Sequence, residues 1–329
     1  MSRRRRNPSH SDERLPDEGG EATRPPVERS PTRHDQLLKT VLATFFQDLV
    51  DLVDPELARE IESDSLEHLD KEVFTDLPEG KRREVDLLVR ARLRSGTDRL
   101  VLVHVEIESA YRSTHPARMA RYFYQIRGRH PEEPVLPIAV YLRGGPVGHE
   151  IRTWSDVIAD FEVVRFRYHA LGLKRDLAEH HLERPNPLGW ALASLMKSDR
   201  FRPAEHKLEC LRRIAGAGFD EARKFLLVNL VETYLELTGD EWERYNRSLA
   251  NEANEEVRAM QLTWEEKHYH KGLLEGSRRT LTRLIEERLG ALPPRSRERL
   301  AAIDDADELD RLASRLLRAK SFADLGLDA

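Results

Sequence analysis

The stretch "EVDLLVRARLRSGTDRLVLVHVEIES" at residues 84–109 decides the fold. Apolar and polar side chains alternate along residues 85–93 and again along residues 101–108. Because successive side chains of a β-strand point to opposite faces, this two-residue period predicts two strands, each with one apolar and one polar face. Ser, Gly, Thr and Asp at residues 95–98 are typical of a tight turn, so the two strands are expected to form an antiparallel hairpin.

The polar face of this hairpin carries three carboxylates, Asp86, Glu106 and Glu108. A three-residue loop at 96–98 would place Asp86 opposite Glu108, with Glu106 on the diagonal. Two unit charges about 4 Å apart near a protein surface repel by roughly 4 kcal/mol, which a bound cation would relieve. Oxygen ligands with open water positions suit Mg²⁺ or Mn²⁺, and such an ion can activate water beside a phosphodiester. The pattern therefore favours a metal site.

Further periodic segments surround the hairpin. A helix is expected from His34 to Val50, followed by a second helix that begins with Pro55 in its first turn. The same region is expected to contain a short strand near Glu72-Val73-Phe74, a helix over 115–129, and two strands over 135–142 and 161–168. The run 135–142 is almost wholly apolar, which is typical of a strand buried on both faces. The order predicts an α/β (α+β) core with a mixed sheet flanked by helices.

The rest of the chain divides by pattern. Residues 1–33 are rich in Arg, Pro, Ser and acids and are expected to be a disordered tail. Residues 34–172 hold the α/β domain, residues 173–271 an all-helical extension, and residues 272–329 a small C-terminal helical domain whose leucine stripe forms a core or a self-association surface. A homo-oligomer formed through this helical C-terminal region is one expectation.

Composition narrows the class of protein. The chain has 329 residues, 34% of them charged, with no apolar run long enough to cross a membrane. No apolar stretch follows Arg3–Arg6, so we expect no signal peptide. A single cysteine, Cys210, excludes a disulfide framework and a multi-cysteine zinc site and favours a cytoplasmic location. The net charge of −5 argues against a tight, non-specific DNA coat but leaves room for an enzyme that contacts DNA briefly.

Several segments together resemble a known family. "HDQLLKTVLATFF" (34–46), "LVLVHVEIES" (100–109), "RMARYFYQIRGRH" (118–130) and "PVLPIAVYL" (134–142) are similar to the PD-(D/E)XK nuclease superfamily, in its recombination-promoting nuclease (Rpn) and transposase-like branch. The segment 275–325 resembles a helical domain of unknown function that ends many such proteins. The resemblance implies a restriction-endonuclease-like core and a Mg²⁺- or Mn²⁺-dependent DNA endonuclease that uses water as the nucleophile.

The resemblance also implies roles for particular residues. Asp86 and Glu106 would be the metal ligands, and Ile107 would offer its backbone carbonyl as a third. Position 108 is Lys in the superfamily and usually Gln in this branch, but here it is Glu108. As an anion it cannot orient water as the lysine does. It could hold a second metal, act as a general base, or mark a chain that has lost cleavage. Glu72 is a further candidate carboxylate.

A substitute cation for the missing lysine is expected on the helix over 115–129. Arg121 is assigned to the catalytic site, and Arg118 and Gln125 are further donors for phosphate, with Tyr122 on the same helix. His104 shares the acidic face as a neighbour and not as a ligand.

Plainer interpretations stay open. Acids and Arg90, Arg92 and Arg94 on an exposed strand face are also typical of a solvated surface. His180-His181 and His268-x-His270 are expected to be ordinary exposed pairs. The main alternative function is a catalytically inactive binding or regulatory protein on the nuclease fold, and a weaker one is a phosphodiesterase directed at RNA or nucleotides. No membrane partner is expected.

Overall fold

The computed structural model describes residues 31–69, 73–75, 82–94 and 100–327 of the chain. The centre of this described part is a six-stranded mixed sheet with the strand order β1-β4-β5-β6-β8-β7. Its strands are β1 (Glu67–His68), β4 (Leu87–Arg92), β5 (Leu100–Glu108), β6 (Val135–Tyr141), β7 (Gly148–Ile158) and β8 (Phe161–Gly172). A separate antiparallel pair is formed by β2 (Val73–Thr75) and β3 (Arg82–Glu84).

The direction of the strands follows from their connections. The pairs β4–β5 and β7–β8 are antiparallel hairpins, whereas β6 runs parallel to both β5 and β8. The parallel step from β5 to β6 is made by helix α4 (His115–Arg129), which begins with Pro116 in its first turn. The mixed α/β sheet flanked by helices, expected from the alternation of the sequence, is confirmed at this level.

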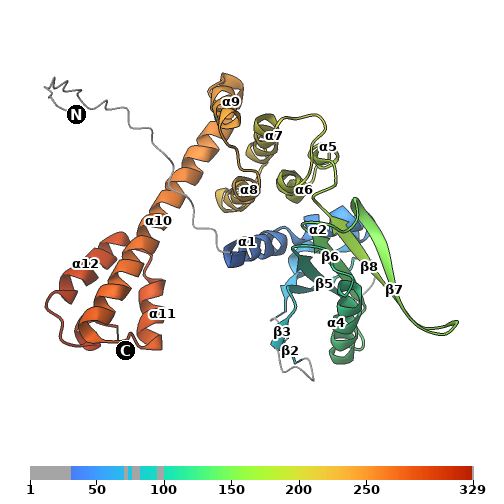
Figure 1. Ribbon diagram of the computed structural model, residues 1–329, viewed down its shortest axis with the longest axis horizontal. Helices are drawn as coiled ribbons and strands as arrows, with labels where there is room; N and C mark the ends of the chain where they lie inside the picture. Colours follow the sequence, from blue (N-terminus) through green and yellow to red (C-terminus); the bar gives the residue numbers. More distant parts are fainter. Residues whose placement is uncertain (1–30, 70–72, 76–81, 95–99, 328–329) are drawn as a thin grey trace, which may run out of the picture.

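Helices cover both faces of the sheet (Figure 1). The N-terminal helices are α1 (Pro31–Thr44), α2 (Phe46–Val53) and α3 (Pro55–Glu60), followed by the short turn η1 (Ser63–Ser65). Leu38, Leu42 and Phe46 from α1 and α2 share one core with the odd-numbered β5 residues Val103 and Val105. On the other face Met119, Tyr122 and Ile126 of α4 are buried, as their three- and four-residue spacing predicts.

Two details differ from the sequence-based expectation. The first helix begins at Pro31 and breaks at Phe45, so that it forms two helices instead of one. The strand β7 was not predicted; it pairs along its whole length with β8, and the resulting ribbon extends from the body of the molecule (Figure 1). The predicted disordered tail falls almost wholly on residues 1–30, which lie outside the described residues.

The helical part of the chain follows β8. Its elements are α5 (Ala178–Leu182), α6 (Pro187–Leu192), η2 (Ala193–Leu195), α7 (Pro203–Ala215), α8 (Glu221–Tyr234), α9 (Asp240–Leu249) and η3 (Glu252–Asn254). Many of their apolar side chains, such as Leu208, Leu211 and Leu230, continue the core that α1 and α2 share with the sheet. The two regions are therefore packed together.

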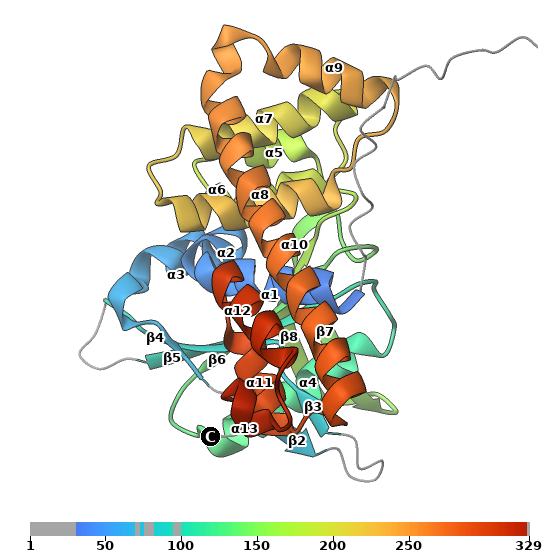
Figure 2. The same ribbon diagram turned by 90° about the vertical axis from the view of Figure 1, so that its left-hand side faces the viewer.

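A single 35-residue helix, α10 (Glu255–Leu289), then runs from these helices to the C-terminal ones (Figure 2). The helices α11 (Pro294–Ala302), α12 (Ala306–Leu316) and α13 (Phe322–Leu325) surround the end of α10. Leu281 and Ile285 of α10 pack with Leu309 and Leu312 of α12 in a core of their own. Gly290, at a φ of 90°, ends α10 where the sequence predicted a stop. None of the described helices is both long and apolar enough to cross a bilayer.

A buried ion pair joins α7, α8 and α10. Lys207 Nζ lies 2.9 Å from Glu232 Oε2, the two side chains are 2% and 7% exposed, and Gln261 donates to the other oxygen of Glu232 at 2.7 Å. We expect Glu232→Leu to lower the free energy of unfolding by about 3–5 kcal/mol because it leaves the Lys207 ammonium buried without its counter-charge.

The matched control is the double variant Lys207→Met/Glu232→Leu, which removes both charges and should recover most of that loss. Urea denaturation of the three proteins measures the difference. A single variant that unfolds within about 1 kcal/mol of the wild type would contradict a structural role for the pair.

Candidate functional site

The hairpin of β4 and β5 brings the predicted carboxylates together. Leu87 pairs with Val105 in this antiparallel hairpin. The preceding residue, Asp86, therefore lies opposite Glu106. The expected register, with Asp86 opposite Glu108, is wrong by two residues. Because side chains alternate with a period of two, a two-residue shift leaves the acids on the same face. The turn that was to fix the register, 96–98, lies outside the described residues.

Backbone hydrogen bonds hold the pair in place. The Ile107 N–H donates to Asp86 Oδ2 at 2.8 Å, and the Asp86 N–H lies 3.4 Å from Glu106 Oε1. Ile107 thus contacts the site through its amide; its carbonyl as a metal ligand stays a prediction. The Asp86 side chain is 17% exposed and that of Glu106 is 6% exposed. The two acids lie at the end of the sheet, partly shielded from water.

A lysine from the first helix reaches the same carboxylate. Lys39 Nζ lies 2.8 Å from Asp86 Oδ1 and 2.8 Å from Asp35 Oδ2, one helical turn earlier in α1. Burial opposes the charge on this ammonium, but the hydrogen bonds to Asp35 and Asp86 raise its pKa above the ordinary value. Sequence reasoning missed Lys39. The only local signal was the i, i+4 spacing of Asp35 and Lys39, which is common on solvated helices.

Despite the Lys39 ammonium, the surroundings of Asp86 disfavour the charged form of its carboxyl group. Burial and the neighbouring Glu106 charge raise its pKa, while the contacts with Lys39 and the Ile107 amide act in the opposite direction. The balance means that negative charge at the pair is only partly compensated by the surrounding protein. A further positive charge would therefore be favourable at this position.

The acidic face is buried, and the expectation of a solvated face is wrong for its central residues. His104 and Glu106 are 0% and 4% exposed because α4 packs over them. His104 Nε2 lies 3.0 Å from Glu106 Oε1, and its ring meets that of Tyr122 edge-on at 5.9 Å between centroids. His104 is thus a neighbour of the acids, as predicted, and it fixes the position of the Glu106 carboxylate.

Glu108 has a different environment, made by α4. Arg118 forms an ion pair with Glu108 Oε1, and His115 Nε2 lies 3.4 Å from the same oxygen. His115 Nδ1 is hydrogen-bonded to the Tyr141 hydroxyl at 2.6 Å, and that hydroxyl lies 3.3 Å from the hydroxyl of Tyr168. Glu108 therefore anchors α4 to the end of β5 through a compensated contact.

The predicted phosphate donors Arg118, Arg121 and Gln125 are all on α4, but each has a different environment. Arg121 is exposed, and Arg118 is the arginine that contacts Glu108. Gln125 is half-buried, and its Oε1 lacks a hydrogen-bond partner within the described part of the chain. Glu72 lies outside the described residues. A direct role of Arg121 in chemistry stays a prediction.

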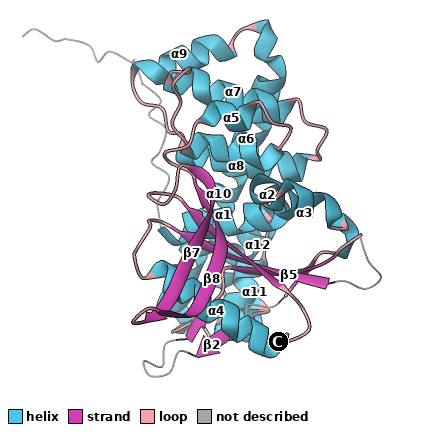
Figure 3. Cartoon of the chain, turned by 90° about the vertical axis from the view of Figure 1, so that its right-hand side faces the viewer, coloured by secondary structure: helices cyan, strands magenta, loops and turns pink. Residues whose placement is uncertain are grey.

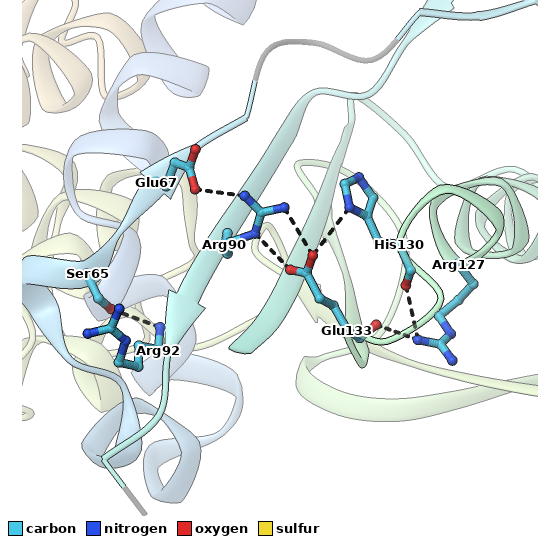
Figure 4. A network of polar contacts seen from close by, with 7 residues as sticks. All are labelled: Ser65, Glu67, Arg90, Arg92, Arg127, His130 and Glu133. Carbon is cyan, nitrogen blue, oxygen red and sulfur yellow. Dashed lines mark hydrogen bonds and ion pairs between the residues drawn. The ribbon is translucent and has the colours of Figure 1, made fainter. Parts of the chain in front are cut away.

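Arginines of β4 are less available to phosphate than the sequence suggested. Arg90 makes two hydrogen bonds to Glu133, at 2.8 and 3.0 Å, and one to Glu67 at 2.8 Å (Figure 4). Hydrogen bonding to Arg90 lowers the pKa of Glu133, which also accepts from His130. Because the guanidinium is held from both sides, Arg90 ties the loop after α4 to the sheet.

Two histidine pairs outside this site were expected to be exposed. His180 is exposed, but His181 is buried and its Nε2 lies 2.7 Å from Asp176 Oδ2. The expectation is therefore wrong for His181, because α5 turns it toward the interior. The side chains of His268 and His270 lie outside the described residues, although both belong to α10.

The chemistry open to the site is that of two oxygen ligands and a nearby ammonium. Among the residues that the structure describes, no group of three or more His, Cys, Asp or Glu side chains is arranged to enclose a metal ion. Magnesium is commonly held by one or two carboxylates, with water and substrate oxygens completing its shell. The pair Asp86 and Glu106 matches that smaller requirement.

Comparison with protein-family models, with curated proteins and with solved structures found no match for this chain.

The burial of His115 gives the site region a pH-dependent stability. His115 is 1% exposed, and burial, the largest cause, lowers its pKa from 6.5 to about 4. Between these values the unfolded chain binds a proton that the folded chain does not, so the free energy of unfolding falls as the pH falls. We expect His115 to account for a loss of about 3 kcal/mol from pH 7.5 to pH 4.

Urea denaturation across this pH range checks the expectation. His115→Gln should flatten the pH dependence, whereas His180→Gln, at an exposed position, should leave it unchanged. Equal pH dependence in wild type and His115→Gln would show that the imidazole does not carry the effect.

Proposed function

We propose that the chain is a divalent-metal-dependent phosphodiester hydrolase of the PD-(D/E)XK type, with DNA as its substrate. The observation that carries the proposal is the contact between Asp86 and Glu106, two shielded acids. Burial, followed by the charge of Glu106, raises the pKa of Asp86. Support for a restriction-endonuclease-like core comes from the order of α1, the β4–β5 hairpin, α4 and the parallel strand β6. The choice of DNA rests on the family resemblance of the sequence.

The donor set fits Mg²⁺ or Mn²⁺. Both side chains offer hard oxygen atoms, and among the described residues hydrogen-bond donors contact only Oε1 of Glu106, so Oε2 remains for a ligand. A cation bound there would supply Lewis-acid activation of water and neutralise charge on the phosphoryl group. Asp86 is the weaker part of the fit, because Lys39 and the Ile107 amide already contact its two oxygens.

The chain's own residues position this site. The Ile107 amide orients Asp86, and His104 orients Glu106. Lys39 brings a cation to the acids from α1, which offsets the absence of a lysine at position 108. Glu108 carries no direct chemistry in this proposal, because its charge is matched by Arg118.

The test compares wild type with Asp86→Asn, which keeps the size of the side chain and removes its charge. We expect plasmid nicking with Mg²⁺ or Mn²⁺ to fall by about a hundredfold or more, because the bound ion supplies several kcal/mol of stabilisation in the transition state. Glu67→Gln is the matched control, since it removes a carboxylate of the edge strand β1 that lies opposite Arg90, four residues along the chain from Asp86. Equal nicking by wild type and Asp86→Asn would refute the assignment.

The role of Glu108 is tested separately. Because glutamine can still accept a hydrogen bond from Arg118, we expect Glu108→Gln to retain cleavage within about tenfold of wild type. Glu108→Lys would oppose Arg118 and should lower the melting temperature. If Glu108→Gln is as inactive as Asp86→Asn, Glu108 is a metal ligand or a base, and its assigned role as an anchor is wrong.

A second candidate function is a binding or regulatory protein without catalysis. The specific observation in its favour is that Lys39 and the Ile107 amide occupy both oxygens of Asp86, as an internal substitute for a metal. Calorimetric titration of the purified chain with Mg²⁺ and Mn²⁺ separates the two functions. Heat of binding that Asp86→Asn abolishes supports the hydrolase, and a titration without binding supports the regulatory protein.

A further inference from the structure

The strand β7 is the open edge of the sheet. In the order of strands it is the last, and within the described part of the chain no strand lies beyond it. It is eleven residues long and lies beside β8 (Figure 3). Together with β8 it continues past the body of the molecule as one arm of a ribbon (Figure 1). An edge strand presents a row of unpaired backbone N–H and C=O groups, which is a template for pairing with another strand.

This edge lacks most features that keep edge strands from pairing. Residues 148–158 contain no proline and no lysine. The irregularity of the ribbon falls where Val163 of β8 has no partner, so that β7 itself is continuous. Ile151, Val157 and Ile158 are 50%, 52% and 68% exposed, which is unusual for a strand that faces only water.

We propose that β7 pairs with β7 of a second copy of this chain, antiparallel and about a two-fold axis at Trp154. A two-fold axis perpendicular to the sheet pairs residues of the same face, so that each contact occurs twice. With Trp154 on the axis, Arg152 lies opposite Asp156 of the second copy, and Ile151 lies opposite its Val157. The strand is thus complementary to itself in both charge and apolar contact.

Neighbouring registers lack this complementarity. Moving the axis to Thr153 sets Glu150 opposite Asp156, a like-charge pair that occurs twice. Moving it to Arg152 sets that arginine opposite its own copy. Like charges directly opposite one another destabilise a strand pair. The register centred on Trp154 is therefore the one that the charges select.

The acidic tip of the ribbon favours a protein partner over nucleic acid. This tip carries Asp156, Asp160 and Glu162, all exposed, so a phosphate backbone would be repelled there. Arg152 contacts Glu150 of its own strand, with 2.5 Å between Nε and Oε1, and its Cζ atom lies 4.9 Å from the centroid of the Tyr111 ring. These contacts hold the guanidinium in one place, where Asp156 of the second copy would add a second carboxylate. Pairing would join two six-stranded sheets into one, with both copies of α4 on the same face.

Charge reversal tests the register. Sedimentation velocity of the full chain over a wide concentration range should show a dimer for wild type. Arg152→Asp and Asp156→Arg should each weaken the dimer by at least about tenfold, because two ion pairs become two like-charge pairs. The double variant Arg152→Asp/Asp156→Arg restores opposite charges and should restore the dimer.

Asp156→Arg is the more decisive single variant, because Asp156 is exposed and its replacement leaves the Arg152–Tyr111 contact intact. Disulfide formation gives an independent measurement. In the proposed register Thr153 faces Ser155 of the second copy, so a mixture of Thr153→Cys and Ser155→Cys proteins should crosslink, while Thr153→Cys alone should not. The native Cys210 is buried and does not interfere.

Two results would overturn the proposal. One is a wild-type chain that stays monomeric at every concentration. The other is a dimer that both single charge reversals leave intact, which would place the interface elsewhere, for example on the C-terminal helices. Because none of these variants lies in the carboxylate site, nicking by the single variants would separate a failure of this interface from a failure of the proposed hydrolase.

Discussion

The structure depends on the burial of β5 on both faces. Its odd-numbered residues pack against α1 and α2, and its even-numbered face is covered by α4. That second face carries His104, Glu106 and Glu108, so ionisable groups lie where charge is costly. His104 and Glu106 contact each other, and Glu108 contacts Arg118 and His115 of α4. Through His115 and the Tyr141 hydroxyl, these contacts tie α4 and β6 to the end of β5.

The elements that could be predicted from the sequence are those whose apolar residues recur with the period of a strand or of a helix. Alternation over 101–108 matches β5 to within one residue, and the three- and four-residue spacing along 115–129 matches α4 at its observed bounds, because these periods depend on backbone geometry alone. The same alternation brought Asp86 and Glu106 to one site even though the register was wrong by two residues. The two-residue period determines to which face of a strand each side chain points, whereas the pairing register depends on the turn and on packing.

What the sequence did not predict arises from contacts between distant segments. Lys39 reaches Asp86 only because α1 packs beside the sheet, and His115 meets Tyr141 only because α4 lies over β6. When the second face of a buried strand is polar, its sequence alternates just as the sequence of a half-exposed strand does. The pattern of β5 therefore did not show that both of its faces are covered. The strand β7 escaped prediction because as an edge it buries little, so its residues lack a regular apolar period.

The three acids differ in how much positive charge lies beside them, and this difference favours Asp86 and Glu106 over Glu108 as the position for chemistry. Glu108 pairs with the Arg118 guanidinium, a full positive charge, and it links α4 to β5. Asp86 contacts the Lys39 ammonium, which Asp35 also contacts, and the Ile107 amide, whereas Glu106 contacts His104 and the Asp86 amide. Burial and, next to it, the Glu106 charge raise the pKa of Asp86, and the contacts with Lys39 and the Ile107 amide act in the opposite direction. This difference between Glu108 and its two neighbours supports the proposed cation site at Asp86 and Glu106 over one at Glu108.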